Sequence, residues 1–384
     1  GFDRPIYTNM QYPFPCDPPR VPEQNPTGCY LRSFSLDEDW LASKQVRVIF
    51  DGVDSAFYLW CNDVWVGYSQ DSRLPAEFDL TDHLRAGANT LKLVVLRYCD
   101  GSYLEDQDMW NLSGIYRSVT LLRKPQARIT DLRVTASLDD RYEDGVLNVG
   151  VITEGARDCQ IVLGLFDTTD LSRSVIPDTP ENMGTRQIDE RGGYANRCEV
   201  TQHIASPRAW SAEQPALYRL TVSLLSADGQ VIEVEACDVG FRTVEIIEGQ
   251  LCLNGQPLLI RGVNKHEHNP CTGHFEHIAD VERDLRRMKQ HNFNAVRCSH
   301  YPHQPGFYQL CDRLGMYVVD EANIETHGMK PMGALADDPA WAAAFLERMT
   351  RMVARDFNHP CIIVWSLGTE RGYGAAPAAM HHWT

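Results

Sequence analysis

Two segments near the end of the sequence carry the residues best suited to chemistry. Residues 318–328 read VVDEANIETHG, and residues 363–372 read IVWSLGTERG. Each begins as a short apolar run, which is typical of a buried parallel strand, and breaks into polar residues and glycine where the strand should end. In a barrel of parallel strands, catalytic side chains gather at the carboxyl ends of the strands. Glu325, His327 and Glu370 are therefore candidates for acid, base or metal-binding roles.

These three side chains combine hard oxygen ligands with an imidazole. With no thiolate near them in the sequence, the combination favours magnesium or manganese over zinc. Glycoside hydrolysis, in turn, needs two carboxyl groups, one as general acid and one as nucleophile or base. Glu370 is a good candidate for the acid, and the sequence offers no equally convincing partner at a later strand end.

Histidines follow two further strand candidates. His266, Glu267 and His268 come after one of them, and His300 comes after the next. On an extended backbone His266 and His268 share a face, so one interpretation is a zinc site. No third ligand follows at a characteristic spacing, however, and hydrogen bonding to a polar substrate is the interpretation we favour.

Composition narrows the class of protein. A chain of 384 residues is expected to form two or three domains. Its net charge of -16 argues against nucleic acid and against an anionic membrane surface as partners. The 12 cysteines are scattered without a C-x-x-C pair, which is typical of free thiols in a reducing compartment. With no secretory signal and no apolar run long enough to span a bilayer, we expect a cytoplasmic protein.

The pattern of expected strands and helices changes twice along the chain, which predicts three units. Residues 1–125 hold short strands separated by turns and predict a jelly-roll β-sandwich, and residues 126–240 predict an immunoglobulin-like β-sandwich. From residue 241 to 384 strands and helices alternate, which indicates a parallel sheet. The four strands expected there are 258–263, 295–298, 317–320 and 362–365. A closed eight-fold barrel needs about 250 residues, so we expect an incomplete (β/α)8 TIM barrel and a fragment of a larger enzyme.

Several longer motifs are spread over the whole sequence. They are PIYTN at 5–9, NPTGCY at 25–30, DGSYLEDQDMW at 100–110, RGVNKHEH at 261–268, RCSHYP at 297–302 and the segment 320–328. Through these motifs the whole sequence resembles the lactose-type β-galactosidases of glycoside hydrolase family 2. The resemblance implies retaining hydrolysis of terminal β-D-galactosides such as lactose, with transfer of galactose as a second outcome. It also implies a homotetramer and a sugar-binding jelly roll, an immunoglobulin-like domain and a catalytic barrel in that order.

The resemblance also implies roles for individual residues. Asn9 and Asp108 match a loop region that reaches the galactose site, and Asp108 matches a sodium ligand. His266 and His300 match residues that bind galactosyl hydroxyls and stabilise the transition state. The matching magnesium ligands are Glu325, His327 and Glu370, with Glu370 as the acid/base.

The sequence departs from the family pattern around the acid. The pattern Gly-Asn-Glu-Ser-Gly is replaced by Gly-Thr-Glu-Arg-Gly at 368–372. The asparagine of the family bonds the 2-hydroxyl, and because Thr369 is shorter and has no amide we expect slower glycosylation. If Arg371 lay beside Glu370 it would favour the carboxylate and weaken the acid. The family's nucleophile glutamate lies beyond Thr384 and the N-terminal segment is absent, so we expect the chain by itself to be inactive.

Two alternatives remain open. A non-catalytic carbohydrate-binding or structural module would make the jelly roll the working part. A sister activity of the same family, β-glucuronidase or β-mannosidase, would use the same barrel. The motif at 100–110 and the pair His266 and His300 favour the galactosidase.

Overall fold

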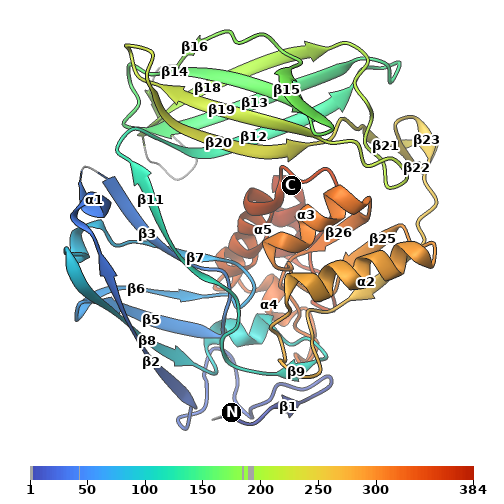
Figure 1. Cartoon of the computed structure of the whole chain (residues 1–384). Coiled ribbons are helices and arrows are strands. Elements are labelled where there is room, and N and C mark those ends of the chain that lie inside the picture. The colour runs from blue at the N-terminus through green and yellow to red at the C-terminus, as the bar shows by residue number, and fades with distance from the viewer. Residues whose placement is uncertain (1–2, 43, 184–185, 189–193) are drawn as a thin grey trace.

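A computed structural model describes residues 3–42, 44–183, 186–188 and 194–384 (Figure 1). Three units follow one another along the chain. The all-β unit drawn in green and yellow lies at the top of Figure 1, the blue all-β unit lies below it, and the orange and red helices lie beside the blue unit. The predicted order of two β-sandwiches followed by a partial barrel is confirmed.

The first unit is built from antiparallel sheets with the strand orders β2-β8-β5-β6 and β11-β3-β7. The hairpin between β5 and β6 turns at Asn62 and Asp63, whose φ values of 50° and 66° suit the tight hairpin turn expected of this dipeptide. Inward-facing side chains such as Phe57 and Leu59 form its core. The elements are β1 Ile6–Tyr7, β2 Thr27–Leu36, α1 Glu38–Leu41, β3 Lys44–Phe50, β4 Val53–Asp54, β5 Ala56–Cys61, β6 Val64–Gln70, β7 Ala76–Asp79, η1 Thr81–His83, β8 Gly87–Leu96, η2 Asp100–Leu104, β9 Trp110–Asn111, β10 Gly114–Ile115 and β11 Val119–Pro125.

The second unit is a sandwich of two antiparallel sheets with the orders β12-β13-β18-β17 and β15-β14-β19-β20. In β19 buried and half-buried residues alternate along the whole strand, as a strand with one face on the core must. Phe241, at the end of the unit, belongs to the same core. The strands are β12 Arg128–Leu138, β13 Gly145–Glu154, β14 Gln160–Asp167, β15 Asp170–Ser174, β16 Glu181–Asn182, β17 Arg186–Ile188, β18 Tyr194–Ile204, β19 Tyr218–Leu225 and β20 Val231–Val239.

The third unit carries a four-stranded parallel sheet of order β24-β25-β26-β27, and the described residues form no closed barrel. A small antiparallel sheet of β21, β22 and β23 leads into it. None of the described helices has the length and apolar character that crossing a bilayer requires. The elements are β21 Val244–Ile247, β22 Gln250–Leu253, β23 Gln256–Pro257, β24 Gly262–Lys265, α2 Ile278–Gln290, β25 Ala295–Cys298, α3 Pro305–Leu314, β26 Tyr317–Glu321, α4 Ala334–Asp337, α5 Ala342–Asp356, β27 Ile362–Ser366 and α6 Ala375–Trp383.

The first strand of this sheet was predicted too early. We expected it at 258–263, but β24 pairs with β25 only from Gly262 onward. Leu259 and Ile260 are 67% and 43% exposed, so this apolar run does not enter the core. Helix α3 was not predicted, although it begins with a proline at its first turn and ends at a left-handed glycine, which are common helix boundary signals.

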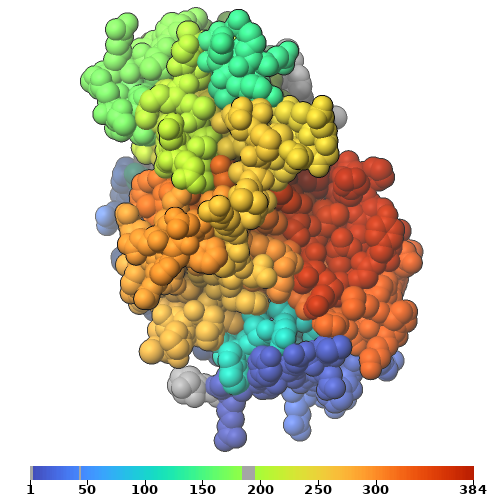
Figure 2. Space-filling view, turned by 90° about the vertical axis from the view of Figure 1, so that its right-hand side faces the viewer, coloured from blue at the N-terminus to red at the C-terminus, as the bar shows by residue number. Residues whose placement is uncertain are grey.

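The second and third units are joined by a buried tryptophan. The Trp210 side chain is fully buried, and its Nε1 donates a hydrogen bond of 2.9 Å to the carbonyl of Asp312 in α3. Its ring meets that of Tyr317 in β26 edge to face, with centroids 5.8 Å apart. Figure 2 shows the other contact of the third unit, where blue and turquoise residues of the jelly roll meet orange and red ones along the lower edge of the molecule.

The contact made by Trp210 gives a stability prediction. Trp210→Ala should lower the free energy of unfolding of the third unit by about 3–5 kcal/mol, since it leaves a cavity and an unpaired carbonyl. Urea unfolding followed by far-ultraviolet circular dichroism would measure this. Leu171→Ala is the control, because Leu171 is 56% exposed and should change little. Equal midpoints for the two variants would contradict the role given to Trp210.

Candidate functional site

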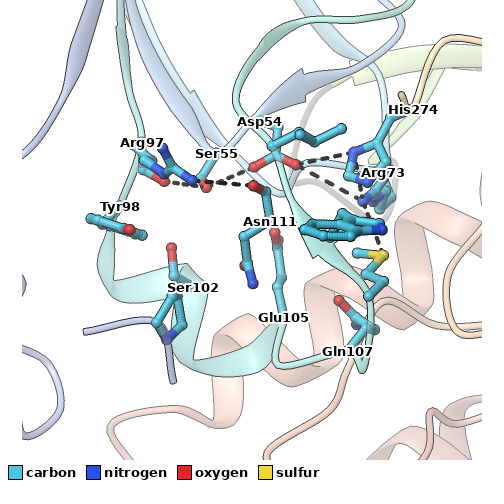
Figure 3. Close-up of a pocket in the computed structure, with 14 residues that line it drawn as sticks. Asp54, Ser55, Arg73, Arg97, Tyr98, Ser102, Glu105, Gln107, Asn111 and His274 are labelled. Atoms are coloured by element: carbon cyan, nitrogen blue, oxygen red, sulfur yellow. Dashed lines mark hydrogen bonds and ion pairs between the residues drawn. The ribbon is translucent and has the colours of Figure 1, made fainter. Parts of the chain in front are cut away.

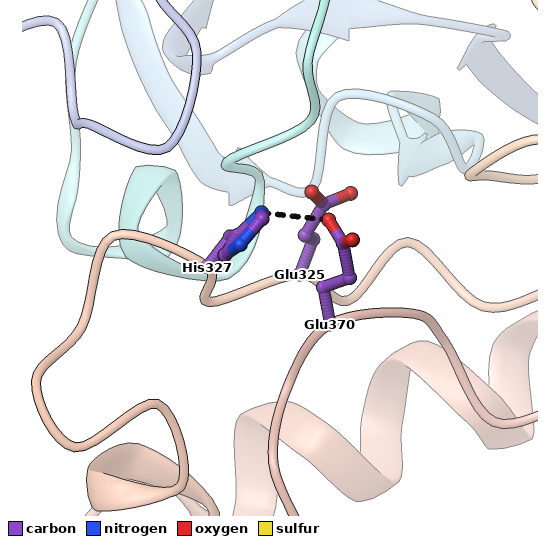
Figure 4. Close-up of side chains that lie close together, drawn as sticks. All are labelled: Glu325, His327 and Glu370. Carbon is purple, nitrogen blue, oxygen red and sulfur yellow. Dashed lines mark ion pairs between the residues drawn. The ribbon is translucent and has the colours of Figure 1, made fainter.

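Three ligand-type side chains meet where β26 and β27 end (Figure 4). Glu325 and His327 follow β26, and Glu370 follows β27. One ligand atom from each lies within 4.8 Å of the others, and His327 Nδ1 is 2.7 Å from Glu370 Oε2. The two strands are neighbours in the parallel sheet, so their carboxyl ends meet at one edge. The structure therefore brings together the three residues that the sequence predicted as a metal site.

The environment of Glu325 suits a bound cation. Its side chain is buried, and its Oε2 atom has no hydrogen-bond partner. Burial, followed by the neighbouring Glu370, raises the pKa of Glu325 to about 10. Two carboxylates this close repel each other unless a proton or a cation lies between them. A divalent ion would satisfy the unpaired oxygen and both charges at once.

The backbone around Glu370 has an uncommon shape. Gly368, Glu370 and Gly372 all have positive φ, at 105°, 41° and 68°. A side chain on Gly368 would bring a Cβ to 2.5 Å from the carbonyl oxygen of Ile324, so glycine is required there. The guanidinium of Arg371 donates to the carbonyls of Leu367 and Gly372, whereas the ion pair of Glu370 is with His327. These contacts do not include the Arg371–Glu370 contact considered from the sequence.

A loop of the jelly roll bonds the segment that follows β26. The Glu325 N–H donates to the carbonyl of Leu104 at 2.8 Å, and the Asp106 N–H donates to the carbonyl of Glu325 at 3.3 Å. The Asp106 carboxylate then accepts the N–H of Gly328 at 2.6 Å. Asp106 was missed from the sequence, although it lies in the 100–110 motif, because nothing local indicates that this loop pairs with a strand end far along the chain.

A buried polar network continues this contact. Arg348 of α5 donates to Glu105 at 2.7 Å and to the carbonyl of Asn323 at 2.8 Å. The Asn323 side-chain amide donates to Asp71 at 2.9 Å. The Arg348 side chain is 4% exposed, so its charge depends on these partners. The network fixes the segment between β26 and Glu325 against the first unit.

The predicted substrate histidines lie beside each other. The rings of His266 and His300 are 5.5 Å apart at their centroids, and they follow the neighbouring strands β24 and β25. His266 Nδ1 lies 3.2 Å from the hydroxyl of Tyr301, and His300 Nδ1 lies 2.7 Å from Glu321. Burial, together with His300, lowers the pKa of His266 to about 4, so this imidazole is neutral near pH 7.

The zinc interpretation of the His266 segment gains no support. Among the described residues, the one group of three or more metal-type ligands is Glu325, His327 and Glu370. Glu267 is instead a buried anchor, which pairs with Arg117 and accepts the Gln304 N–H at 2.6 Å. Burial alone would raise the pKa of Glu267, but Arg117 and then His303 hold it at about 2.

Asn9 and Asp108 also come together. The Asn9 amide donates to one oxygen of Asp108 at 2.9 Å, and the hydroxyl of Tyr7 donates to the other at 2.6 Å. The pairing of β1 with β9 places these residues opposite each other. Asp108 comes two residues after Asp106, whose N–H donates to the carbonyl of Glu325. A sodium ion at Asp108 stays a prediction.

A small polar cavity is lined in part by residues of the 100–110 motif (Figure 3). Asp54, Arg73, Glu105, Gln107 and His274 are among the residues that line it. Its volume of about 30 Å³ suits water rather than a sugar. Burial raises the pKa of Asp54 to about 6, although Arg73 opposes this. The cavity lies among the residues that hold the loop in place, and it is too small to be the substrate site.

Three family descriptions match successive parts of the chain. "Glycosyl hydrolases family 2, sugar binding domain" matches residues 1–125, and "Glycosyl hydrolases family 2" matches residues 127–242. "Glycosyl hydrolases family 2, TIM barrel domain" matches residues 244–384. Together they account for nearly the whole chain.

Curated relatives are similar over the full chain. A beta-galactosidase of Aeromonas hydrophila is 61% identical over 381 residues, which are 99% of this chain and 37% of the relative. A beta-galactosidase of Enterobacter cloacae is 58% identical over 385 residues, which are 100% of this chain and 37% of the relative. The chain thus spans 37% of the length of these relatives.

Solved structures of beta-glucuronidases share the fold. The enzyme of Bifidobacterium dentium has a TM-score of 0.78 and 25% identity, with 88% of this chain and 59% of that chain covered. The enzyme of Ruminococcus gnavus has a TM-score of 0.75 and 23% identity, with 89% and 57% covered.

The anchor formed by Glu267 predicts a pH-dependent stability. Near neutral pH, Glu267→Gln should cost about 3–5 kcal/mol, because it leaves Arg117 buried without its counter-charge. The pKa of Glu267 lies below its ordinary value of 4.5, so its stabilisation is present above pH 4.5 and is lost as the pH falls toward 2. Urea unfolding at a series of pH values should show the difference between wild type and variant shrinking over that window.

The control is Glu143→Gln, because the Glu143 side chain is 64% exposed and should not change the stability at any pH. A difference between wild type and Glu267→Gln that stayed constant from pH 7 to pH 3 would show that the lost contribution is one of shape and not of charge.

Proposed function

The chain belongs to glycosyl hydrolase family 2, and from this premise we propose that it is part of a β-galactosidase that hydrolyses terminal β-D-galactosides such as lactose with retention of configuration. Identities of 61% and 58% to beta-galactosidases over nearly the entire chain support this substrate class. The observation that carries the proposal is the meeting of Glu325, His327 and Glu370 at the ends of two neighbouring strands.

Glu370 is the proposed acid/base of this reaction. It protonates the leaving oxygen of the galactoside and then takes a proton from the incoming water. Its left-handed backbone directs the side chain toward His327, with which it pairs at 2.7 Å. We assign the binding of galactosyl hydroxyls to His266 and His300, which follow the neighbouring strands β24 and β25. We assign Asn9 and Asp108 to the edge of the same site.

Magnesium is the proposed ion of the three-ligand site. Its residues fit a hard cation, since Glu325 brings an unpaired buried oxygen and the set contains two carboxylates and one imidazole. When bound, the ion would supply a fixed positive charge that offsets the repulsion between the Glu325 and Glu370 carboxyl groups. Sodium at Asp108, a homotetrameric whole protein and a cytoplasmic location complete the proposal.

A second candidate function is β-glucuronidase, because beta-glucuronidase structures match the fold with TM-scores of 0.78 and 0.75. The identities of those matches are 25% and 23%, far below the 61% found with a beta-galactosidase. Comparing galactoside with glucuronide hydrolysis by the whole protein that contains this chain separates the two. Faster hydrolysis of the glucuronide would reject the galactosidase.

The metal site can be tested on the chain itself with manganese as the probe. We expect wild type to bind one Mn²⁺, and Glu370→Gln and Glu325→Gln to weaken binding by at least about tenfold, because each removes a ligand charge. Isothermal titration and the Mn²⁺ paramagnetic resonance signal would measure the affinity. Glu347→Gln is the matched control, since the Glu347 side chain is 64% exposed and pairs with Arg351.

Equal affinity of Glu370→Gln and wild type would place the ion elsewhere. Loss of binding in Glu347→Gln would show that the measured affinity belongs to general surface charge.

The second carboxyl group decides whether the chain works alone. Retaining hydrolysis needs a nucleophile in addition to the acid, and the carboxyl found beside Glu370 is Glu325, which is assigned to the ion. We therefore expect the 384-residue chain to hydrolyse a nitrophenyl β-galactoside no faster than its Glu370→Gln variant. Hydrolysis by the isolated chain that Glu370→Gln abolishes would contradict this expectation. In the whole protein, Glu370→Gln should lower kcat by about 10²–10⁴-fold.

A further inference from the structure

The loop that carries Glu370 requires something to hold its shape. Residues 367–372 connect the end of β27 toward α6, and three of these residues have positive φ. Two are glycines, for which this conformation is easy, but Glu370 itself adopts φ of 41°. A non-glycine residue in this region is strained and persists only when its surroundings fix it.

The segment that follows β26 fixes the loop from one side. The Thr369 N–H donates to the carbonyl of Ile324 at 3.1 Å, and the Thr326 N–H donates to the carbonyl of Glu370 at 3.3 Å. These two bonds bind the loop to the segment that carries Glu325. They leave the two ends of the loop, at Leu367 and Gly372, to be held by other groups.

Arg371 joins these two ends. Its Nε donates to the carbonyl of Leu367 at 2.9 Å, and its Nη1 donates to the carbonyl of Gly372 at 2.8 Å. The side chain is half-buried, and its Cδ lies 3.4 Å from the point where a Cβ on Gly368 would be. A planar guanidinium can hold two carbonyls at fixed angles in a way that a lysine ammonium cannot. One side chain thus closes the loop around the residue that precedes it.

We infer that Arg371 is a positioning residue, which closes the loop 367–372 and so holds Glu370 in the geometry for metal binding and proton transfer. The role rests on the function proposed for Glu370. It also explains how an arginine can follow the acid in the sequence without pairing with it, because its guanidinium bonds backbone carbonyls of its own loop. A serine at this position is too short to bridge both carbonyls, so the closure is a feature of this chain's own sequence.

The closing of the loop 367–372 by Arg371 can be tested without metal or substrate. Hydrogen exchange of residues 366–374 should be about tenfold faster in Arg371→Met, because the loop opens more often, and intermediate in Arg371→Lys, which keeps one donor group. The matched control is Arg313→Met, since the Arg313 side chain is 61% exposed and lies in α3. Its exchange over residues 366–374 should equal that of wild type. Unchanged exchange in Arg371→Met would overturn the inference.

Mn²⁺ affinity then tests the positioning of Glu370. Arg371→Met should weaken binding by about tenfold and Arg371→Lys by less, while Arg313→Met should bind as wild type does. A loop that exchanges faster while the Mn²⁺ affinity of Arg371→Met stays at the wild-type value would overturn the positioning role. Absence of Mn²⁺ binding by wild type would contradict the proposed metal site instead. Hydrogen exchange alone would then show whether Arg371 closes the loop.

Discussion

The candidate site depends on a backbone contact between two units of the chain. Glu325 does not extend its own sheet; its N–H and carbonyl bond Leu104 and Asp106 of the jelly roll. Beyond the end of β26 the backbone groups of the chain no longer pair within the sheet, and burying them without other partners costs free energy. The jelly roll supplies those partners. The candidate ligand Glu325 is thus oriented by a unit that precedes the partial barrel by more than a hundred residues.

The interface that makes this contact combines an apolar cluster, in which Tyr103 and Leu104 pack with Trp341, and buried ion pairs. Arg348 meets Glu105 and Asn323, and Arg117 meets Glu267. Buried ion pairs add little stability compared with a well-packed apolar contact, but removing one partner is costly. Such an interface fixes one relative placement of the units, because any slip would leave a charge unpaired. This suits a site whose ligands come from different segments.

The sequence predicted the parts of the site that are local. Strand ends with carboxylates and imidazoles could be found from short apolar runs, and the structure brings Glu325, His327 and Glu370 together. The roles of Asp106 and Glu267 could not be found in this way, because each depends on a partner from another unit. The strand predicted at 258–263 was misplaced for a related reason. Burial, which is a property of the whole fold, decides where an apolar run becomes a strand.

The loop around Glu370 departs from the family pattern at two positions, and these can be separated into those that affect the shape of the loop and those that affect other contacts. Gly368 is retained, and its place against Ile324 leaves no room for a side chain. The neighbouring positions can vary as long as the loop keeps its shape. Among the described residues Arg371 bonds the carbonyls of Leu367 and Gly372, so an arginine in place of the serine of the family pattern changes how the loop is held, and Glu370 pairs with His327 and not with this arginine. Thr369 keeps its backbone bond to Ile324, and the amide side chain of the family pattern is what this position lacks. Under the proposed function, the presentation of the acid and the recognition of the sugar are thus separable in this loop: the backbone bonds hold Glu370, and we expect the side chain at position 369 to alter the binding of the sugar.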